Sequence, residues 1–248
     1  MRYQAQQDFL KDKVILVTGA GDGLGQTAAK AYAAHGATVV LLGRTTKKLE
    51  KTYDDIINAG HPEPAIYPLN LEGATPKDYE ELADTLKEQF GSLHGVLHSA
   101  AILGSTSPIQ QHDIEIWYQV MQVNLNAPFV MTRALLPLLR ETPNSKIVFT
   151  TDDKSKAYWG AYGISKDALT SFMKILGDEL DTESNAVQVN AINPGAVRTQ
   201  MRVRAFPGED PSTLPLTDDV MPVYLYVMSQ DCKEIAQTLY AQTENISK

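Results

Sequence analysis

Residues 13–37 read KVILVTGAGDGLGQTAAKAYAAHGA, and this stretch decides the fold. Val14 to Val17 form a short apolar run rich in β-branched residues, which predicts a strand. Glycines follow at positions 19, 21, 23 and 25, and apolar residues recur at helical spacing between Leu24 and Tyr32, which predicts a helix over residues 23–35. Glycine lets the backbone come close to a ligand, and the free N–H groups and dipole of a helix start favour a phosphate. The segment therefore has the outline of a dinucleotide site.

A lone glycine-rich turn can also be no more than a tight connection. Here a second apolar run, Thr38 to Leu42, follows the helix directly, so the turn lies inside a strand-helix-strand unit of the type that binds nucleotides at the carboxyl ends of its strands. The spacing, Thr18-Gly19-x-x-x-Gly23-x-Gly25, differs from the common G-x-G-x-x-G. The surrounding unit, more than the turn alone, makes nucleotide binding the expectation.

Composition limits the class of protein. The chain has 248 residues, 43% of them apolar, which predicts one domain over residues 1–248 with a well-buried core. Lys and Arg number 22 against 30 Asp and Glu, a net charge of -8, which argues against nucleic acid or a membrane surface as partner. We find neither a signal peptide nor the run of roughly 18 apolar residues that indicates a membrane span. Cys232 is the only cysteine, so an internal disulfide is impossible and a reducing cytoplasm fits.

The rest of the chain alternates between strand and helix signals. A long helical region over about residues 113–139 should split or kink near Ala127, because Pro128 and Pro137 lie within it. Further strands are expected at 65–69, 96–101, 146–150, 187–192 and 238–241, and further helices at 47–59, 76–90, 161–180 and 218–228. This alternation predicts a single-domain α/β fold, a Rossmann-like doubly wound parallel sheet of about seven strands with helices on both faces.

Four clusters of polar and small residues lie where a ligand of such a sheet would bind. They are His98-Ser99-Ala100-Ala101, Asn124 in the long helix, Tyr162-Gly163-Ile164-Ser165-Lys166, and the run from Asn193-Pro194-Gly195 to Thr199. In order and spacing they are similar to the motifs of the short-chain dehydrogenase/reductase family over nearly the whole chain. Within that family, VLLGR, GVLH, QVN and YWGAY resemble the small group of bacterial YciK-type oxidoreductases. The resemblance implies an NAD(P)(H)-dependent enzyme that interconverts a carbonyl and an alcohol by hydride transfer.

Tyr162 and Lys166 match the family's Y-x-x-x-K, and Asn124 matches its relay asparagine. Residues four apart share a helix face, so the ammonium of Lys166 can lie near the phenol. A phenol has a pKa of about 10, and positive charge from Lys166 and an oxidised nicotinamide should favour the phenolate. Tyr162 is thus the expected general acid/base.

The resemblance also implies the residues around the cofactor. They are Gly19, Gly21, Asp22, Gly23, Leu24, Gly25, Arg44, Asn70, Leu71, Ser99, Ala100, Ala101, Tyr162, Lys166, Pro194, Gly195, Val197 and Thr199. No metal is expected, since His94 and His98 flank a strand with no third ligand evident. Hydrolysis by a Ser-His-Asp triad is not expected either, because the chain lacks a G-x-S-x-G elbow.

Several positions depart from the family. The family usually has Asn-Asn-Ala-Gly where this chain has His98-Ser99-Ala100-Ala101, and Asp where it has Asn70; both changes could weaken cofactor binding. Arg44 follows Gly43 where an NAD enzyme has an acid, which favours NADP over NAD, although Asp22 opposes this electrostatically. NAD remains the alternative. By resemblance, a homodimer or homotetramer is expected through residues 128–140 and 161–180, the alternative being a monomer whose helices are merely well packed.

The family's catalytic serine has no obvious counterpart. Its usual spacing before Tyr162 reaches Phe149, inside a strand, and alignment of that strand places the serine on Thr151 or Asp152 instead. Thr151 would keep a hydroxyl donor, Asp152 would set a carboxylate beside the phenol, and Ser155 is a third candidate. The favoured interpretation is an oxidoreductase of reduced or narrow activity acting on a small carbonyl or alcohol, with Thr151 in the serine's role. The alternative is a cofactor-binding, catalytically silent sensor or interaction protein.

Overall fold

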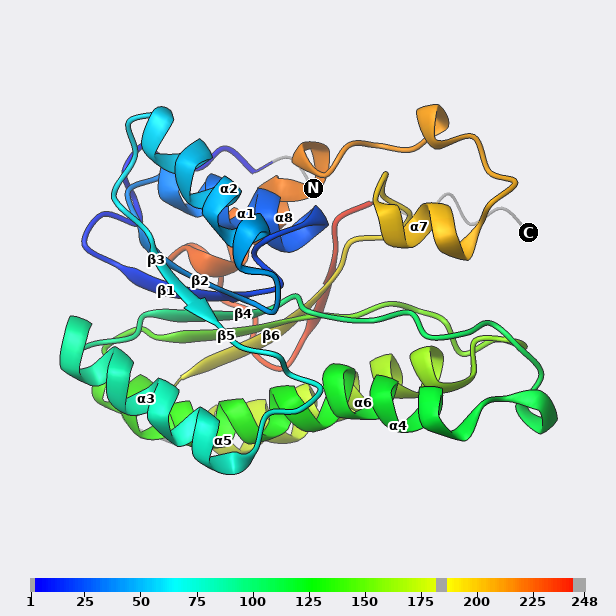
Figure 1. The fold of residues 1–248 in the computed structure, drawn as a ribbon. Coiled ribbons are helices and arrows are strands. Elements are labelled where there is room, and N and C mark those ends of the chain that lie inside the picture. Colours follow the sequence, from blue (N-terminus) through cyan, green and yellow to red (C-terminus); the bar gives the residue numbers. More distant parts are fainter. Residues whose placement is uncertain (1–2, 182–186, 243–248) are drawn as a thin grey trace.

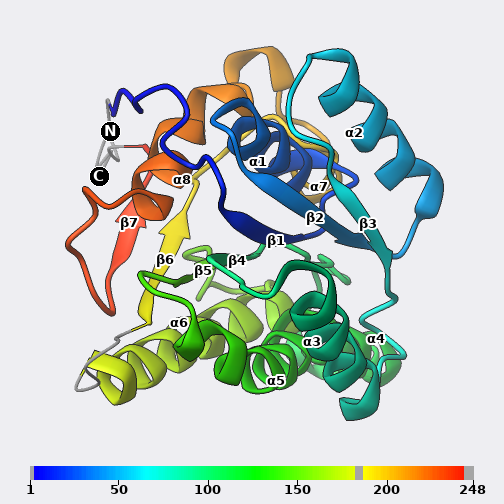
Figure 2. The same ribbon diagram turned by 90° about the vertical axis from the view of Figure 1, so that its left-hand side faces the viewer.

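The computed structural model describes residues 3–181 and 187–242, within which seven strands form one parallel sheet. The strand order is β3-β2-β1-β4-β5-β6-β7 (Figures 1 and 2). The strands are β1 (Val14–Thr18), β2 (Thr38–Gly43), β3 (Ala65–Pro68), β4 (Gly95–His98), β5 (Lys146–Thr150), β6 (Gln188–Asn193) and β7 (Thr238–Tyr240). Chain order runs outward from β1 in both directions, so the topological switch point lies between β1 and β4. The predicted doubly wound sheet is confirmed.

Helices cover both faces of the sheet (Figure 2). They are α1 (Gly23–Ala34), α2 (Thr46–Asn58), α3 (Pro76–Phe90), α4 (Ile114–Met121), α5 (Ala127–Glu141), α6 (Gly160–Asp181), α7 (Gln200–Ala205) and α8 (Met221–Met228), with short 3-10 turns at Ile109–Gln111, Pro211–Thr213 and Asp218–Val220. In Figure 1, α1, α2 and α8 lie above the sheet and α3 to α6 lie below it. None of the helices in the described ranges is long and apolar enough to cross a bilayer.

Side-chain alternation along the strands divides the core into two layers. Ile15 and Val17 of β1 pack with α1, α2 and α8, whereas Leu16 between them packs with α3, α5 and α6. Neighbouring strands repeat the alternation in register, with Leu16 beside Val40 and Val96. The strands read as continuous apolar runs because both faces are covered.

Strand β4 is shorter than the sequence predicts. It ends at His98, because the backbone N–H groups of Ser99 and Ala100 both donate to Thr18 Oγ1, each at 3.0 Å, and so leave the sheet. Thr18 itself ends β1. One hydroxyl therefore turns the chain away at the switch point and opens the space in front of the glycine-rich turn.

The long helical region breaks just before Pro128, as predicted, whereas Pro137 lies inside α5 without ending it. Residues Gln122–Asn126 form a π-helical turn, and α5 begins at Ala127. Pro128 has no N–H, and its ring conflicts with the carbonyl four residues earlier, which is that of Asn124. The wider turn relieves that conflict, and such turns are frequent at functional sites.

Candidate active site at the switch point of the sheet

One cavity of about 830 Å³ lies over the carboxyl ends of the strands. Every residue expected to contact the cofactor lines it, together with Thr151, Tyr162 and Lys166. Asn124 does not line it. Residues predicted from seven separate stretches of sequence thus meet in one place.

The glycine-rich turn has no room for a side chain at Gly19 or Gly25. Gly19 has a φ of +70°, and a Cβ there would lie 3.0 Å from the backbone of Ala100. A Cβ on Gly25 would lie 2.5 Å from the carbonyl oxygen of Gly19, so α1 packs directly on the end of β1. This bare backbone at the start of α1 fits the diphosphate of a dinucleotide.

Asp22 caps α1, its Oδ1 accepting from the Gly23 N–H at 2.8 Å, while its Oδ2 pairs with Lys48 Nζ at 2.5 Å. This ion pair offsets the negative charge of Asp22, which by itself would repel a bound phosphate. Arg44 follows β2 and lies exposed on the cavity wall, which Lys48 also lines. Asn70 is also exposed there, and its Oδ1 accepts from the Glu72 N–H at 3.3 Å.

Tyr162 and Lys166 lie one turn apart near the start of α6 and are 7% and 4% exposed. Lys166 Nζ lies 5.8 Å from the centre of the Tyr162 ring and donates to the carbonyl oxygen of Thr150 at 2.7 Å. Burial lowers the pKa of Lys166 to about 8. Burial, and after it Asp152, raises the pKa of Tyr162 well above its ordinary value. Without a cofactor the protein therefore favours the phenol form of Tyr162, and the phenolate that was expected beside an oxidised nicotinamide stays a prediction.

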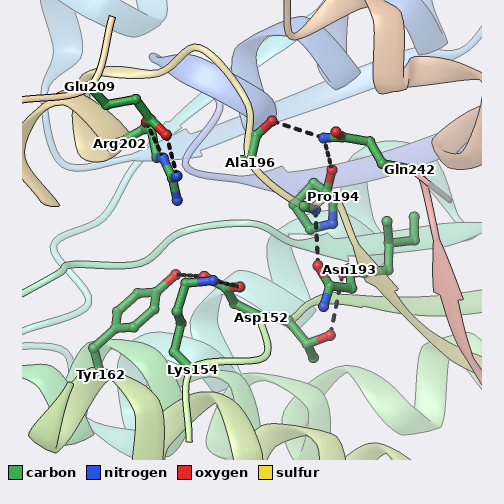
Figure 3. Close-up of polar contacts among 12 residues, drawn as sticks. Asp152, Lys154, Tyr162, Asn193, Pro194, Ala196, Arg202, Glu209 and Gln242 are labelled. Atoms are coloured by element: carbon green, nitrogen blue, oxygen red, sulfur yellow. Dashed lines mark hydrogen bonds and ion pairs between the residues drawn. The ribbon is translucent and has the colours of Figure 1, made fainter. Parts of the chain in front are cut away.

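Of the three candidates for the serine's position, Asp152 faces the phenol. The Tyr162 hydroxyl donates to Asp152 Oδ2 at 3.2 Å, and Lys154 Nζ donates to Asp152 Oδ1 at 2.9 Å (Figure 3). The Thr151 hydroxyl points to β6 and donates to the Ile192 carbonyl at 3.4 Å. The Ser155 hydroxyl donates to the Asp167 carboxylate on the outside of α6.

Asn124 links two segments of the site through side-chain hydrogen bonds. Its Oδ1 accepts from the Ile102 N–H at 2.8 Å, and its Nδ2 donates to the Ile102 carbonyl at 2.9 Å and to Ser165 Oγ at 3.1 Å. The π-helical turn thereby joins the segment after β4 to α6.

A second residue that supports the site, Gln242, was not predicted from the sequence. The Gln242 amide donates to the carbonyl oxygens of Pro194 and Ala196, at 2.7 and 2.9 Å, and so holds the loop after β6 (Figure 3). Gly195 in that loop has a φ of +71°, and its N–H donates to Asn193 Oδ1 at 2.9 Å. No sequence signal points to Gln242, because it lies 48 and 46 residues beyond the two carbonyls that it holds.

The outer wall of the cavity was also not predicted. Arg202 forms two hydrogen bonds of 2.6 Å with Glu209, and its guanidinium lies 3.6 Å from the centre of the Phe206 ring. Phe206 contacts Trp159, whose ring centre is 5.7 Å from that of Tyr162. In Figure 3 the Arg202–Glu209 pair lies across the opening from Tyr162. Only the spacing of Trp159 and Tyr162, three residues apart, could have signalled this wall.

His94 and His98, the two histidines considered above as metal ligands, both have structural partners. His94 Nδ1 accepts from the Val14 N–H at 3.1 Å, and the buried His98 ring stacks on Phe149, with Nε2 3.0 Å from Thr132 Oγ1. Burial lowers the pKa of His98 to about 3. Over residues 3–181 and 187–242, no three His, Cys, Asp or Glu side chains gather as a metal site would require.

A Tyr-Lys pair beside a glycine-rich turn, at the switch point of a doubly wound sheet, is typical of nicotinamide-dependent oxidoreductases. The chain belongs to the short-chain dehydrogenase family, whose model matches residues 13–210.

Relatives and solved structures agree with this assignment. The chain is 43% identical over 236 residues to the uncharacterized oxidoreductase YciK of Escherichia coli (strain K12), covering 94% of this chain and 92% of that protein. A short chain dehydrogenase structure from Pseudomonas syringae is 50% identical with a TM-score of 0.95, covering 98% and 99% of the two chains. Another, from Escherichia coli CFT073 in complex with NADPH, is 42% identical with a TM-score of 0.93, covering 96% and 100%. The resemblance to YciK-type oxidoreductases is confirmed.

Proposed function

We propose that the protein is an NADPH-dependent carbonyl reductase of the short-chain dehydrogenase family. The observation that carries this proposal is the buried phenol of Tyr162, held protonated beside Lys166 in the cavity of the glycine-rich turn. Reduction of a carbonyl needs a proton donor, and a phenol is the form that can donate. The raised pKa of Tyr162 keeps this side chain in the proton-donating form at neutral pH.

The bare turn from Gly19 to Gly25 and the exposed Arg44 fit NADPH, which supplies a hydride to the substrate carbon when bound. Tyr162 donates a proton to the substrate oxygen. Lys166, held by the Thr150 carbonyl, fixes the position of the helix turn that carries the phenol. Asn124 is a positioning residue, because it acts through Ile102 and Ser165. Thr151 keeps its proposed role only if its hydroxyl leaves Ile192.

The test is NADPH oxidation with a panel of ketones, aldehydes and quinones. The second candidate, a cofactor-binding protein without turnover, is favoured by one observation: the group that faces the phenol is the carboxylate of Asp152, not a hydroxyl. Tight NADPH binding with no oxidation across the panel would decide for this second function.

We expect Arg44→Ala to raise the Kd for NADPH by roughly 10- to 100-fold and to leave that for NADH nearly unchanged, because a charge-assisted hydrogen bond to a 2′-phosphate is lost. Calorimetry with both cofactors measures this. Lys47→Ala is the matched control, since Lys47 is exposed three residues on but does not line the cavity. If the wild type binds NADH as tightly as NADPH, the NADP preference is wrong.

We propose a homodimer or homotetramer formed through α5 and α6. Phe129 on α5 and Ile164 and Ile175 on α6 are 50%, 44% and 59% exposed, which is an unusual share of apolar surface for two neighbouring helices. Light scattering should give a mass at least twice 27.3 kDa. Phe129→Glu should lower it, while Ile57→Glu on α2 should not. A wild-type mass of 27.3 kDa at micromolar concentration contradicts the oligomer.

The proposed setting is the reducing cytoplasm, with a small carbonyl compound as ligand and no nucleic acid or membrane partner. Cys232, the single cysteine, is buried, and the formal net charge is -8. Both fit a protein that needs no disulfide and whose net negative charge disfavours a nucleic-acid backbone as partner.

A further inference from the structure

The carboxylate of Asp152 sits next to the phenol that the proposed reaction uses. Its Oδ2 accepts the Tyr162 hydroxyl at 3.2 Å, and its Oδ1 is held by Lys154 at 2.9 Å. The side chains of Asp152 and Lys154 are 19% and 21% exposed, and both line the cavity. One carboxylate oxygen is thus fixed by Lys154, while the other faces the reacting position.

The connection that carries Asp152 is held close to α6. The carbonyl oxygen of Lys154 lies so near Gly163 that a Cβ on that glycine would be 2.4 Å away. Lys154 Nζ also lies 5.5 Å from the centre of the Trp159 ring. These contacts position the carboxylate beside Tyr162 and leave it little freedom to swing away.

This arrangement has a consequence for the substrate. When Tyr162 turns its proton toward a carbonyl oxygen, Asp152 Oδ2 loses the phenol as its hydrogen-bond donor and faces the lone pairs of that same carbonyl. An acceptor left without a donor in a partly buried site is unfavourable. A substrate that brings its own donor on the neighbouring carbon replaces the lost hydrogen bond.

We propose that Asp152 is a specificity-determining residue that selects α-hydroxy carbonyl substrates, which are reduced to vicinal diols. The two neighbouring oxygens of such a substrate lie within hydrogen-bond distance of one another, as do Tyr162 Oη and Asp152 Oδ2. The carbonyl carbon gains a hydride from NADPH, its oxygen gains the Tyr162 proton, and the α-hydroxyl donates to Asp152. Tyr162 regains a proton from water, and NADP⁺ is the second product. The inference rests on the proposed reductase function.

The experiment compares α-hydroxyacetophenone with α-methoxyacetophenone, in which a methyl group replaces the hydroxyl hydrogen and so removes the donor. Their ring suits the wall formed by Trp159 and Phe206. We expect kcat/KM with NADPH to be roughly 10- to 100-fold higher for the hydroxy ketone, the effect of one hydrogen bond to a charged group. Asp152→Ser should bring the ratio close to one. Asp153→Ser should keep the wild-type ratio, because Asp153 is exposed and does not line the cavity.

Binding provides a readout that needs no turnover. Calorimetry on the NADP⁺-loaded protein should show styrene glycol binding roughly 10-fold or more tightly than its primary methyl ether. Equal affinities, or equal kcat/KM values for the two ketones in the wild type, overturn the inference whether or not Asp152→Ser folds. Preference for the glycol without reduction of either ketone upholds the role of Asp152 in recognition and overturns the reductase function instead.

Discussion

Replacing Tyr162 by Phe is expected to lower kcat for carbonyl reduction by roughly 10²- to 10⁴-fold, the usual contribution of a positioned proton donor. The affinity for NADPH should change much less than kcat. The substitution removes one oxygen and leaves the ring, which packs on Trp159 at 5.7 Å and lies beside Lys166. It also frees Asp152 Oδ2, whose donor was the lost hydroxyl. Initial rates of NADPH oxidation, with NADPH binding measured in parallel, test the prediction.

Tyr158→Phe is the matched control. It deletes the same atom from a tyrosine four residues earlier, which is 61% exposed and does not line the cavity, and it should leave the rate unchanged. If wild type and Tyr162→Phe are indistinguishable on every substrate while NADPH still binds, Tyr162 is not the proton donor, and the cofactor-binding function without turnover is preferred.

Gly25→Ala is expected to damage both stability and activity. Its Cβ would lie 2.5 Å from the Gly19 carbonyl oxygen and 3.0 Å from that of Thr18, and backbone atoms cannot move aside as a flexible side chain can. Overpacking of this kind costs about 1–3 kcal/mol. Because the same displacement shifts the turn where NADPH is proposed to bind, kcat/KM should fall by about 100-fold.

Thermal unfolding and steady-state kinetics measure the two effects of Gly25→Ala. Gly73→Ala serves as control, because Gly73 is exposed, a methyl group there would meet nothing within 4 Å, and the residue lies outside the cavity. A Gly25→Ala protein with wild-type melting temperature and kinetics would mean that the turn is looser than its contacts indicate.

The sequence was sufficient to predict the fold because the signals that determine it are local. Apolar runs bounded by glycine mark the strands, and Thr75, Pro76 and Gly91 set the ends of α3 through a capping box and a left-handed C-cap. The overlong prediction for β4 has a different cause. The hydroxyl of Thr18, far away in sequence, accepts the hydrogen bonds of the Ser99 and Ala100 N–H groups, so these two residues leave the strand. The residues around position 99 contain no pattern that predicts this contact.

The candidate site was predictable where backbone placement decides it, as for the glycine-rich turn and the Y-x-x-x-K helix. The sequence could not predict which residue faces the reacting position where this depends on the direction of a single side chain. Thr151 and Asp152 are neighbours, so their side chains point to opposite sides, one to Ile192 and the other to Tyr162. The choice between them depends on how the short connection packs on Gly163, which is a tertiary contact. Residues such as Gln242 and Phe206 act through partners that no local pattern identifies.

The contact between Gln242 and the loop after β6 also orders events during synthesis of the chain. The ribosome releases the glycine-rich turn first and the Tyr-Lys helix later, and both can pack before translation ends, since chains begin to fold from the N-terminus. The loop at Pro194 and Ala196 keeps two carbonyl oxygens without their amide donor until residue 242 has emerged and β7 has paired with β6. A nascent chain that has folded as far as β6 therefore still lacks the two hydrogen bonds that hold this loop, and it gains them only when β7 and Gln242 have been added.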